Sequence, residues 1–384
     1  MTDLPAAAAV TRLARFVAED ALAADDAGLS SVRDSLIDTL GCMVLGAQSD
    51  VARKARDAVR AMGSAGDAGI IGGGGSVNRA HAALLNATAG HAFDFDDWEI
   101  PGNTHPSVVL WPALLAVSPP HASGHQLAQA YLAGYEVIAR LGEALNFAHY
   151  DAGWHSTATL GAPGAAAACA RLLSLNAEDT AHAISIAISS AVGYTCQFGS
   201  HAKPVQAGYA AQAGVSAVYM AQAGLTGQAH VLDHPRGMAV LMNGALGTLS
   251  DTLDRLGDGY AIETYGLVFK PWPSCGYTHR CMTAAVQLRE QLSVNQIDAI
   301  ELSLPDFHAA VVPFAQPQSR AQALFSLPYV VAMGLCHGNL GINDLDASTW
   351  DCDRIRALIL RTRVNPFAPV DPHLNYSERD PDRV

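Results

Sequence analysis

Apolar residues recur at helical spacing through the first two thirds of the chain. Val32, Leu36, Leu40 and Met43 follow one another at steps of four, four and three residues, which places them on one face of a helix. Alanine-rich segments of the same kind continue to about Gly257, without a run of alternating apolar and polar residues. The pattern predicts a large all-helical domain, with helices at residues 8–24, 28–47, 50–63, 78–92, 106–117, 124–146, 157–174, 177–191, 206–224 and 229–235.

The pattern changes after Tyr265. Residues 270–276 are rich in proline and glycine, and a helix is predicted at 278–291. Residues 297–304 alternate as a strand does, and 326–335 read as another buried helix. We therefore predict a mainly α fold: a large all-helical domain at 1–266 and a second, smaller α+β lid domain at 267–384. A strand pattern begins at residues 382–384, so we expect the C-terminus to be incomplete.

Composition bears on the partners of the protein. Charged residues make up only 15% of the 384 residues, against about 25% in an average soluble protein. Much of the surface must therefore be small residues or lie in an interface, which favours a homo-oligomer, most simply a homodimer. The formal charge of −13 argues against nucleic acid as a partner, because phosphate binding needs a face rich in lysine and arginine.

Targeting signals and cysteine motifs are not visible in the sequence. The first twenty residues carry acidic side chains and no long apolar segment, unlike a secretory signal. The alanine-rich residues 157–175 are interrupted by Pro163 and Arg171, so we predict a buried helix and no membrane span. The seven cysteines form no C-x-x-C pair, which supports neither a disulfide framework nor a zinc site. These features together predict a cytoplasmic protein.

Lysine is rare and its placement is informative. The chain has three lysines against twenty arginines, and Lys203 and Lys270 each stand directly before a proline. An ammonium group is a compact point charge whose pKa can be shifted by burial, whereas a guanidinium is a planar fork that is always charged. Lys203 and Lys270 are therefore candidates for an anion-binding site, with chance placement in an arginine-rich chain as the alternative.

A cluster of acidic residues and histidines follows the helix predicted at 78–92. Asp94, Asp96 and Asp97 lie within four residues, between His91 and His105. Crowded carboxylates raise one another's pKa, which is one way to make a general acid or base near neutral pH. Two alternatives are a Mg, Mn or Fe site, since these metals take aspartate and histidine ligands, and plain helix capping.

A third histidine precedes a predicted helix start. His155 stands before Ser156 and Thr157, either of which could cap the helix. The positive end of a helix lowers the pKa of an imidazole and favours a bound anion, although a lone histidine is more often structural. If Lys203 and Lys270 converge in a cleft between the two domains, they would clamp two carboxylates there.

The order of these motifs resembles a known family. The chain contains Asp-Phe-Asp-Asp, Thr-His-Pro-Ser, Gly-Trp-His-Ser-Thr, His-Ala-Lys-Pro, Phe-Lys-Pro-Trp-Pro-Ser-Cys and Phe-Ser-Leu-Pro-Tyr in that order. From about residue 10 to 380 it resembles the 2-methylcitrate dehydratase (MmgE/PrpD) superfamily, which also includes cis-aconitate decarboxylase and iminodisuccinate epimerase. The resemblance implies a homodimer that uses no cofactor and no metal, and that acts on a di- or tricarboxylate between a helical domain and a lid.

The resemblance also implies which residues form the site. The family's catalytic positions fall on Asp94, His105, His155, Lys203, Lys270 and, as a looser match, Tyr329. We expect the substrate to contact Asp97, Trp98, Ser107, Thr157, Gln197, Cys275, His279 and Arg280. The chain departs from the family pattern at two of these positions. Trp98 replaces a small or hydroxyl residue, and Cys275 stands where some decarboxylases have histidine, which weakens the decarboxylase assignment.

We therefore predict hydration or dehydration of a 2-methylcitrate-like substrate. In this prediction Lys203 and Lys270 hold carboxylates, while His105, oriented by Asp94, and His155 act as an acid–base pair on opposite faces of the reacting carbon. Epimerisation of an iminodisuccinate-like substrate and decarboxylation of the cis-aconitate type are the alternatives within the family. A metal-dependent hydro-lyase and a carboxylate-binding protein without turnover are the alternatives outside it.

Overall fold

The computed structural model describes residues 7–369 and 381–384, and its fold is mainly α-helical. This part of the chain holds nineteen α-helices and two small two-stranded sheets. It divides into two compact units. The first unit runs to Ala92 and includes 96–194 and 204–269, and the second unit contains 93–95, 195–203 and the chain from Lys270 on.

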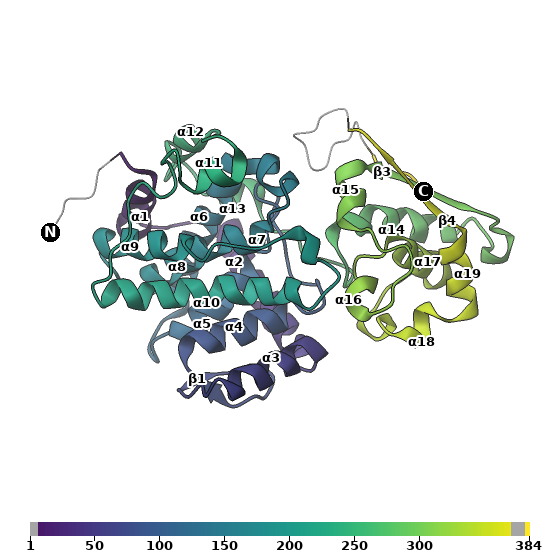
Figure 1. Ribbon diagram of the computed structural model, residues 1–384, viewed down its shortest axis with the longest axis horizontal. Coiled ribbons are helices and arrows are strands. Elements are labelled where there is room, and N and C mark those ends of the chain that lie inside the picture. Colours follow the sequence, from purple (N-terminus) through teal and green to yellow (C-terminus); the bar gives the residue numbers. More distant parts are fainter. Residues whose placement is uncertain (1–6, 370–380) are drawn as a thin grey trace. The chain divides into compact units, whose positions relative to one another are not determined.

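The first unit is built around two helices rich in small residues, α6 (Gly124–Asp151) and α8 (Gly161–Leu172) (Figure 1). A Cβ on Gly134 of α6 would come 2.8 Å from the Ala168 Cβ, so only glycine allows the two helices to approach this closely. The other helices of this unit are α1 (Ala9–Glu19), α2 (Asp26–Gly46), α3 (Asp50–Ala61), α4 (Arg79–Gly90), α5 (Ser107–Val117), α7 (Ser156–Thr159), α9 (Ala177–Ile188), α10 (Ala202–Gln222), α11 (Met238–Asn243), α12 (Leu249–Leu253) and α13 (Ala261–Tyr265).

The first unit differs from the prediction in several details, among them α11, α12 and α13, which were not predicted. The helix predicted at 8–24 ends at Glu19, because Leu22 adopts a φ of +50° and its N–H binds the Asp20 side chain at 2.8 Å. The helix predicted at 229–235 is absent and the segment forms turns, since Pro235 disfavours a helical conformation at the residue before it. The unit is also not entirely helical, because β1 (Ala68–Gly69) pairs with β2 (Ser76–Val77).

The second unit combines helices with a parallel pair of strands. Strand β3 (Ile300–Pro305) pairs with β4 (Thr362–Phe367), with Ile300 opposite Thr362, and Ser303 also exchanges two backbone hydrogen bonds with Arg383. Helices α14 (Gly276–Arg289) and α17 (Leu327–His337) pack together, as Gly334 of α17 allows close contact with Met282 of α14. The remaining helices of this unit are α15 (Asp306–Val311), α16 (Arg320–Ala323), α18 (Ala347–Trp350) and α19 (Asp353–Arg361).

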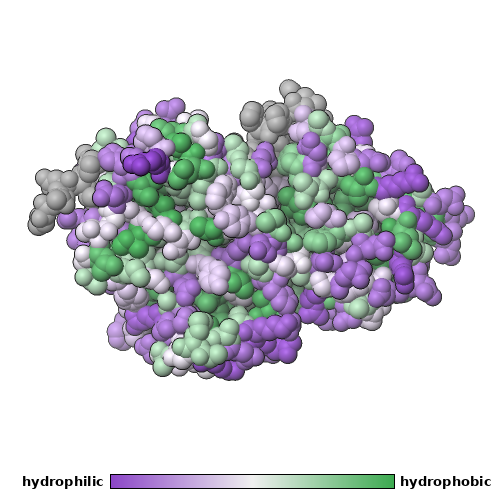
Figure 2. Space-filling view, in the orientation of Figure 1, coloured by the Kyte–Doolittle hydropathy of each residue, from purple (hydrophilic) through white to green (hydrophobic). Residues whose placement is uncertain are grey.

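The surface of the first unit carries apolar residues at several places. On the face shown in Figure 2 they gather around α11 and α12, where Leu241 is 69% exposed and Leu246 43% exposed. Tyr209 and Met220 are exposed on α10 and line a groove of about 480 Å³ with residues of α9. The homodimer expected from the sequence stays a prediction. In the part of the chain that the structure describes, no helix is both long enough and apolar enough to cross a bilayer.

Candidate active site

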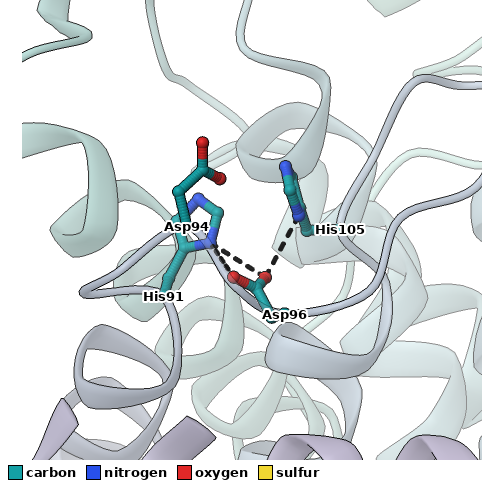
Figure 3. Close-up of side chains that lie close together, drawn as sticks. All are labelled: His91, Asp94, Asp96 and His105. Carbon is teal, nitrogen blue, oxygen red and sulfur yellow. Dashed lines mark hydrogen bonds and ion pairs between the residues drawn. The ribbon is translucent and has the colours of Figure 1, made fainter. Parts of the chain in front are cut away.

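Two imidazoles of the first unit share one carboxylate. His91 follows the last turn of α4, and its Nδ1 lies 2.9 Å from both carboxylate oxygens of Asp96 (Figure 3). The Nδ1 of His105 lies 3.1 Å from Asp96 Oδ2. The side chains of His91 and Asp96 are fully buried, and that of His105 is 14% exposed. Because an ionised carboxylate only accepts hydrogen bonds, the Nδ1 atom of each ring carries the proton.

Asp96 is the negative charge of this group. Its burial would raise the pKa of the carboxyl, but the adjacent His91 and His105 imidazoles outweigh burial and hold the pKa well below its usual range. The carboxylate on the His105 ring is thus Asp96, whereas the sequence analysis gave the orienting role to Asp94. The other neighbouring aspartates have different partners in the structure, and the orienting role expected for Asp94 stays a prediction.

The backbone around His105 is also held in place. Its N–H donates to the Thr157 hydroxyl at 3.0 Å, and its Nδ1 lies 2.9 Å from the backbone carbonyl of Asp97. Thr157 was predicted to contact the substrate, and in the structure its hydroxyl positions His105. The two acceptors around Nδ1, a carboxylate and a carbonyl, leave Nε2 as the basic nitrogen of the neutral ring.

His155 completes a group of three imidazoles. Its Nδ1 lies 2.6 Å from Oε1 of Gln206, and its backbone N–H donates to the Gly193 carbonyl at 2.9 Å. The ring of His91 lies 4.6 Å from that of His105 and 6.1 Å from that of His155, measured between centroids. We call His91, Asp96, His105 and His155 the imidazole cluster. Sequence reasoning gave no role to His91 or Gln206, although His91 stands five residues before Asp96.

A second charged group lies in the second unit. Lys203 Nζ and Lys270 Nζ donate to the same oxygen, Oδ1 of Asp94, at 2.9 and 3.0 Å, and Lys270 also donates to the Asp94 carbonyl at 2.8 Å. All three residues are buried, and Asp94 adopts a φ of +49°, which aspartate tolerates better than most residues. We call these three residues the lysine cluster. One carboxylate between two ammonium groups leaves the cluster with a net charge of +1.

Aromatic rings surround one of the ammonium groups. Lys203 Nζ lies 5.2 Å from the ring centroid of Phe198 and 5.3 Å from that of Phe325. Each ring presents its negative face to the cation and keeps water away from it. The Lys203 ammonium is thereby held in a dry, fixed position next to Asp94.

Two neutral side chains lie beside the lysine cluster. Burial, and next the charge of Asp94, raise the pKa of the Cys275 thiol to about 12. Burial, and next the charge of Lys270, lower the pKa of His279 to about 4. Both side chains are therefore uncharged at neutral pH and add no charge to the cluster. Nε2 of His279 is buried and has no hydrogen-bond partner among the described residues.

The imidazole cluster has the residue types of a metal site. His91, Asp96 and His105 each offer a ligand atom, and these atoms lie within 4.8 Å of one another. A ring nitrogen that carries a proton cannot bind a metal, and both Nδ1 atoms already donate to Asp96. A divalent ion would have to bind the Nε2 atoms of the rings or displace these protons.

Comparison with known proteins assigns the chain. The sequence model of the MmgE/PrpD N-terminal domain matches residues 11–246, and that of the MmgE/PrpD C-terminal domain matches residues 272–379. The chain belongs to the MmgE/PrpD family. It is 28% identical to the cis-aconitate decarboxylase of Mus musculus over 301 residues, which are 74% of this chain and 60% of that protein.

Other MmgE/PrpD relatives carry similar names. A cis-aconitate decarboxylase-like protein, oryM, of Aspergillus oryzae is 26% identical over 358 residues, covering 87% of this chain and 74% of the relative. The cis-aconitate decarboxylase of Homo sapiens is 28% identical over 300 residues, covering 74% of this chain and 61% of the relative. The chain thus spans about three fifths of the length of its mammalian relatives.

Two residues that the MmgE/PrpD resemblance placed at the substrate bind each other. The Ser107 hydroxyl donates to Asp97 Oδ2 and lies 2.6 Å from the Tyr131 hydroxyl. Asp97 is fully buried, and burial raises the pKa of its carboxyl well above the usual range, with Asp38 and Asp96 adding to the effect. Burial therefore favours the protonated form of Asp97, and its contact with substrate stays a prediction.

Four further MmgE/PrpD candidates lie in different surroundings. Tyr329 is buried and its hydroxyl donates to the Asp344 backbone carbonyl. Arg280 lies 3.5 Å from the Asp382 carboxylate. Gln197 is exposed, and Trp98 pairs through its backbone with Val268 at 3.1 and 2.8 Å. None of these contacts is with the lysine or imidazole cluster, and the predicted roles of the four residues stay predictions.

Proposed function

We propose that this MmgE/PrpD protein is a cofactor-free lyase that moves a proton at a carbon next to a carboxylate of a small di- or tricarboxylate. The observation that carries the proposal is the presence of two specialised groups, three gathered imidazoles and two buried ammonium groups on one aspartate. Asp94 and Asp96 stand two residues apart in the chain, so their Cα atoms are at most about 8 Å apart. Chain connectivity therefore supports one shared substrate.

The lysine cluster would bind the substrate as an anion. Its two ammonium groups lie in a buried environment, where a carboxylate is attracted strongly. Removing a proton next to a carboxylate builds up negative charge on that group. Ammonium groups already fixed in position stabilise this charge without reorganisation, and that lowers the barrier.

The imidazole cluster would move the proton. In a dehydration, Nε2 of one histidine takes the proton from the carbon next to the carboxylate. The electron pair of the C–H bond forms the C=C bond, and the hydroxyl on the neighbouring carbon leaves with a proton from the second histidine, as water. His105 is held by Asp96 and Thr157, and His155 by Gln206, so each presents a defined nitrogen.

Decarboxylation is the second candidate, because the curated relatives above carry names of cis-aconitate decarboxylases. In that reaction the bond to one carboxylate breaks and carbon dioxide leaves. The electron pair stays on carbon, and a protonated histidine supplies the proton that replaces the carboxylate. The same clusters serve both reactions, since each builds negative charge next to a carboxylate.

The test is incubation in heavy water with 2-methylcitrate, citrate, cis-aconitate and iminodisuccinate, followed by NMR. Loss of water, with one C–H of the substrate exchanged for deuterium, supports the hydro-lyase. Release of carbon dioxide, with one deuterium gained by the product, supports the decarboxylase. His105→Gln should lower turnover by about 10²- to 10⁴-fold with little change in substrate binding. Unchanged turnover in this variant would refute the role of His105.

Two controls separate the rival classes. Activity that survives exhaustive chelation excludes the metal-dependent hydro-lyase. Tight binding of a tricarboxylate without exchange or turnover, in the presence of the whole panel, would instead identify a binding protein.

A further inference from the structure

His91 and His105 both contact the Asp96 carboxylate through Nδ1. His91 Nδ1 lies 2.9 Å from both oxygens of Asp96, so it holds the carboxylate along its full edge. His105 Nδ1 lies 3.1 Å from one of these oxygens. The His91 side chain is fully buried, and its ring lies edge to face against the His105 ring at 4.6 Å.

One carboxylate cannot fully compensate two imidazolium ions. When His105 accepts a proton at Nε2, its new charge is stabilised by Asp96 through Nδ1. A charged His91 would compete for the same carboxylate and repel the His105 cation across a distance of less than 5 Å between the rings. A neutral His91 donates one hydrogen bond to Asp96 and so weakens the attraction of Asp96 for His105 only in part.

We propose that His91 is a positioning residue that stays neutral and, by donating to Asp96, both fixes this carboxylate and keeps His105 from becoming too basic. The proposal rests on the proposed function, in which His105 exchanges a proton with the substrate. Without the His91 donor, the full charge of Asp96 would act on His105. The pKa of His105 would then rise, and the ring would already be protonated at neutral pH and could not accept a proton from the substrate.

The substitutions in this test leave the other ionisable groups near His105 in place. In the first unit these are Asp97, whose carbonyl accepts from His105, and His155, whose ring lies 6.1 Å from that of His91. Glu99 lies in the same loop and binds Gly102 and Thr104. Asp94, which binds two lysines, offers a carboxylate oxygen within 4.8 Å of the ligand atoms of His91, Asp96 and His105.

The test compares two substitutions at His91 in the full chain. His91→Asn places an amide N–H where Nδ1 stands and keeps the donor, whereas His91→Leu removes it. The imidazole titrations are followed by NMR on protein labelled with ¹⁵N-histidine, with the His105 signal assigned from His105→Gln. We expect the His105 titration to move up by about one pH unit in His91→Leu, a tenfold change in its protonation equilibrium, and to return close to wild type in His91→Asn.

A control variant separates this effect from a loss of packing. His149→Asn changes another buried histidine of the first unit, whose Nε2 bonds the Thr159 hydroxyl at 3.0 Å, and should leave the His105 titration in place. The acid limb of the pH–rate profile should move with the titration in His91→Leu and stay in place in the control. A structural role alone would lower activity without moving either curve.

Three results would overturn the inference. The first is a His105 titration that is the same in wild type and in His91→Leu. The second is an equal shift in His91→Asn and His91→Leu. The third needs only the wild type, and so remains decisive if the leucine variant does not fold: a His91 ring that is charged at pH 7.5 while His105 is neutral. If His105→Gln keeps full turnover, the proposed function fails, but these titrations still decide the coupling.

Discussion

Removing the Asp94 carboxylate should destabilise the protein more than removing either lysine that binds it. Asp94 Oδ1 receives both Lys203 Nζ and Lys270 Nζ, and the exposed fractions of the two lysines are only 4% and 6%. In Asp94→Asn the two buried ammonium groups lose the carboxylate that they share, and the net charge of the three residues rises from +1 to +2. In Lys203→Met one ammonium and one carboxylate remain as a balanced pair.

The magnitudes follow from burial. Breaking a buried ion pair by removing one partner costs about 3–5 kcal/mol, because the other charge is left uncompensated. We expect Asp94→Asn to lose about 3 kcal/mol of unfolding free energy, near the lower end, since the amide oxygen still accepts a hydrogen bond. Lys203→Met should lose about 1 kcal/mol, because the thioether can pack between the Phe198 and Phe325 rings where the ammonium now lies.

Urea unfolding, followed by the fluorescence of the five tryptophans, measures these differences. The double variant Asp94→Asn with Lys203→Met should be more stable than Asp94→Asn alone, since it removes one of the two uncompensated charges. Asp34→Asn is the control, because Asp34 forms an exposed pair with Arg33 and should change stability by less than about 0.5 kcal/mol. A larger loss in Lys203→Met than in Asp94→Asn would refute the reasoning.

Three further predictions follow from the same structure. Ellman's reagent at pH 8 should label two thiols quickly, the exposed Cys196 and Cys352, and the other five only after unfolding, because those five are buried; three or more fast thiols would contradict this. Burial raises the pKa of Glu99 to about 7, although hydrogen bonds from Thr104 and Gly102 act in the opposite direction. The folded protein therefore binds this proton more tightly than the unfolded chain, so the resulting stability is full below pH 4.5 and is lost as the pH rises through 7. Glu99→Gln should therefore gain up to about 3 kcal/mol relative to wild type between pH 4.5 and 8, and a pH-independent difference would refute this. Lys270→Arg should lower turnover at least tenfold although the charge is kept, because a planar fork cannot replace a point donor that binds both the side chain and the carbonyl of Asp94, and wild-type turnover would contradict it.

Much of the fold and some of the site follow from the sequence. Helical periodicity predicted most helices of the first unit to within a few residues, and alternation predicted the strand that is observed as β3. The failures lie where local signals compete, as at 229–235, where apolar spacing favours a helix and Pro235 disfavours it. The rarity of lysine singled out Lys203 and Lys270, which the structure brings together on Asp94, and their role in binding an anion stays a prediction.

The pairing of charges could not be read from the sequence. Gln206 lies 51 positions from His155, and an amide at that distance gives no signal of its own in a helix of small residues. His91 was visible beside the acidic run, but its partner depends on how the chain turns after α4. Asp94 adopts a φ of +49°, a conformation that is uncommon for any residue except glycine and that sequence patterns do not predict for a given aspartate.

The turn of the backbone at Asp94 explains how the acidic residues at 94–97 come to lie in three different environments. Asp94 binds two ammonium groups, Asp96 is ionised between two imidazoles, and Asp97, whose pKa is raised by burial, accepts from Ser107. Had the three carboxylates shared one environment, they would have raised one another's pKa and made an ionised carboxylate at His105 more costly. Separate partners therefore leave a positive group suited to an anion and a negative group suited to a base, carried by residues only two positions apart. A reaction that binds a carboxylate and removes a neighbouring proton uses a group of each kind.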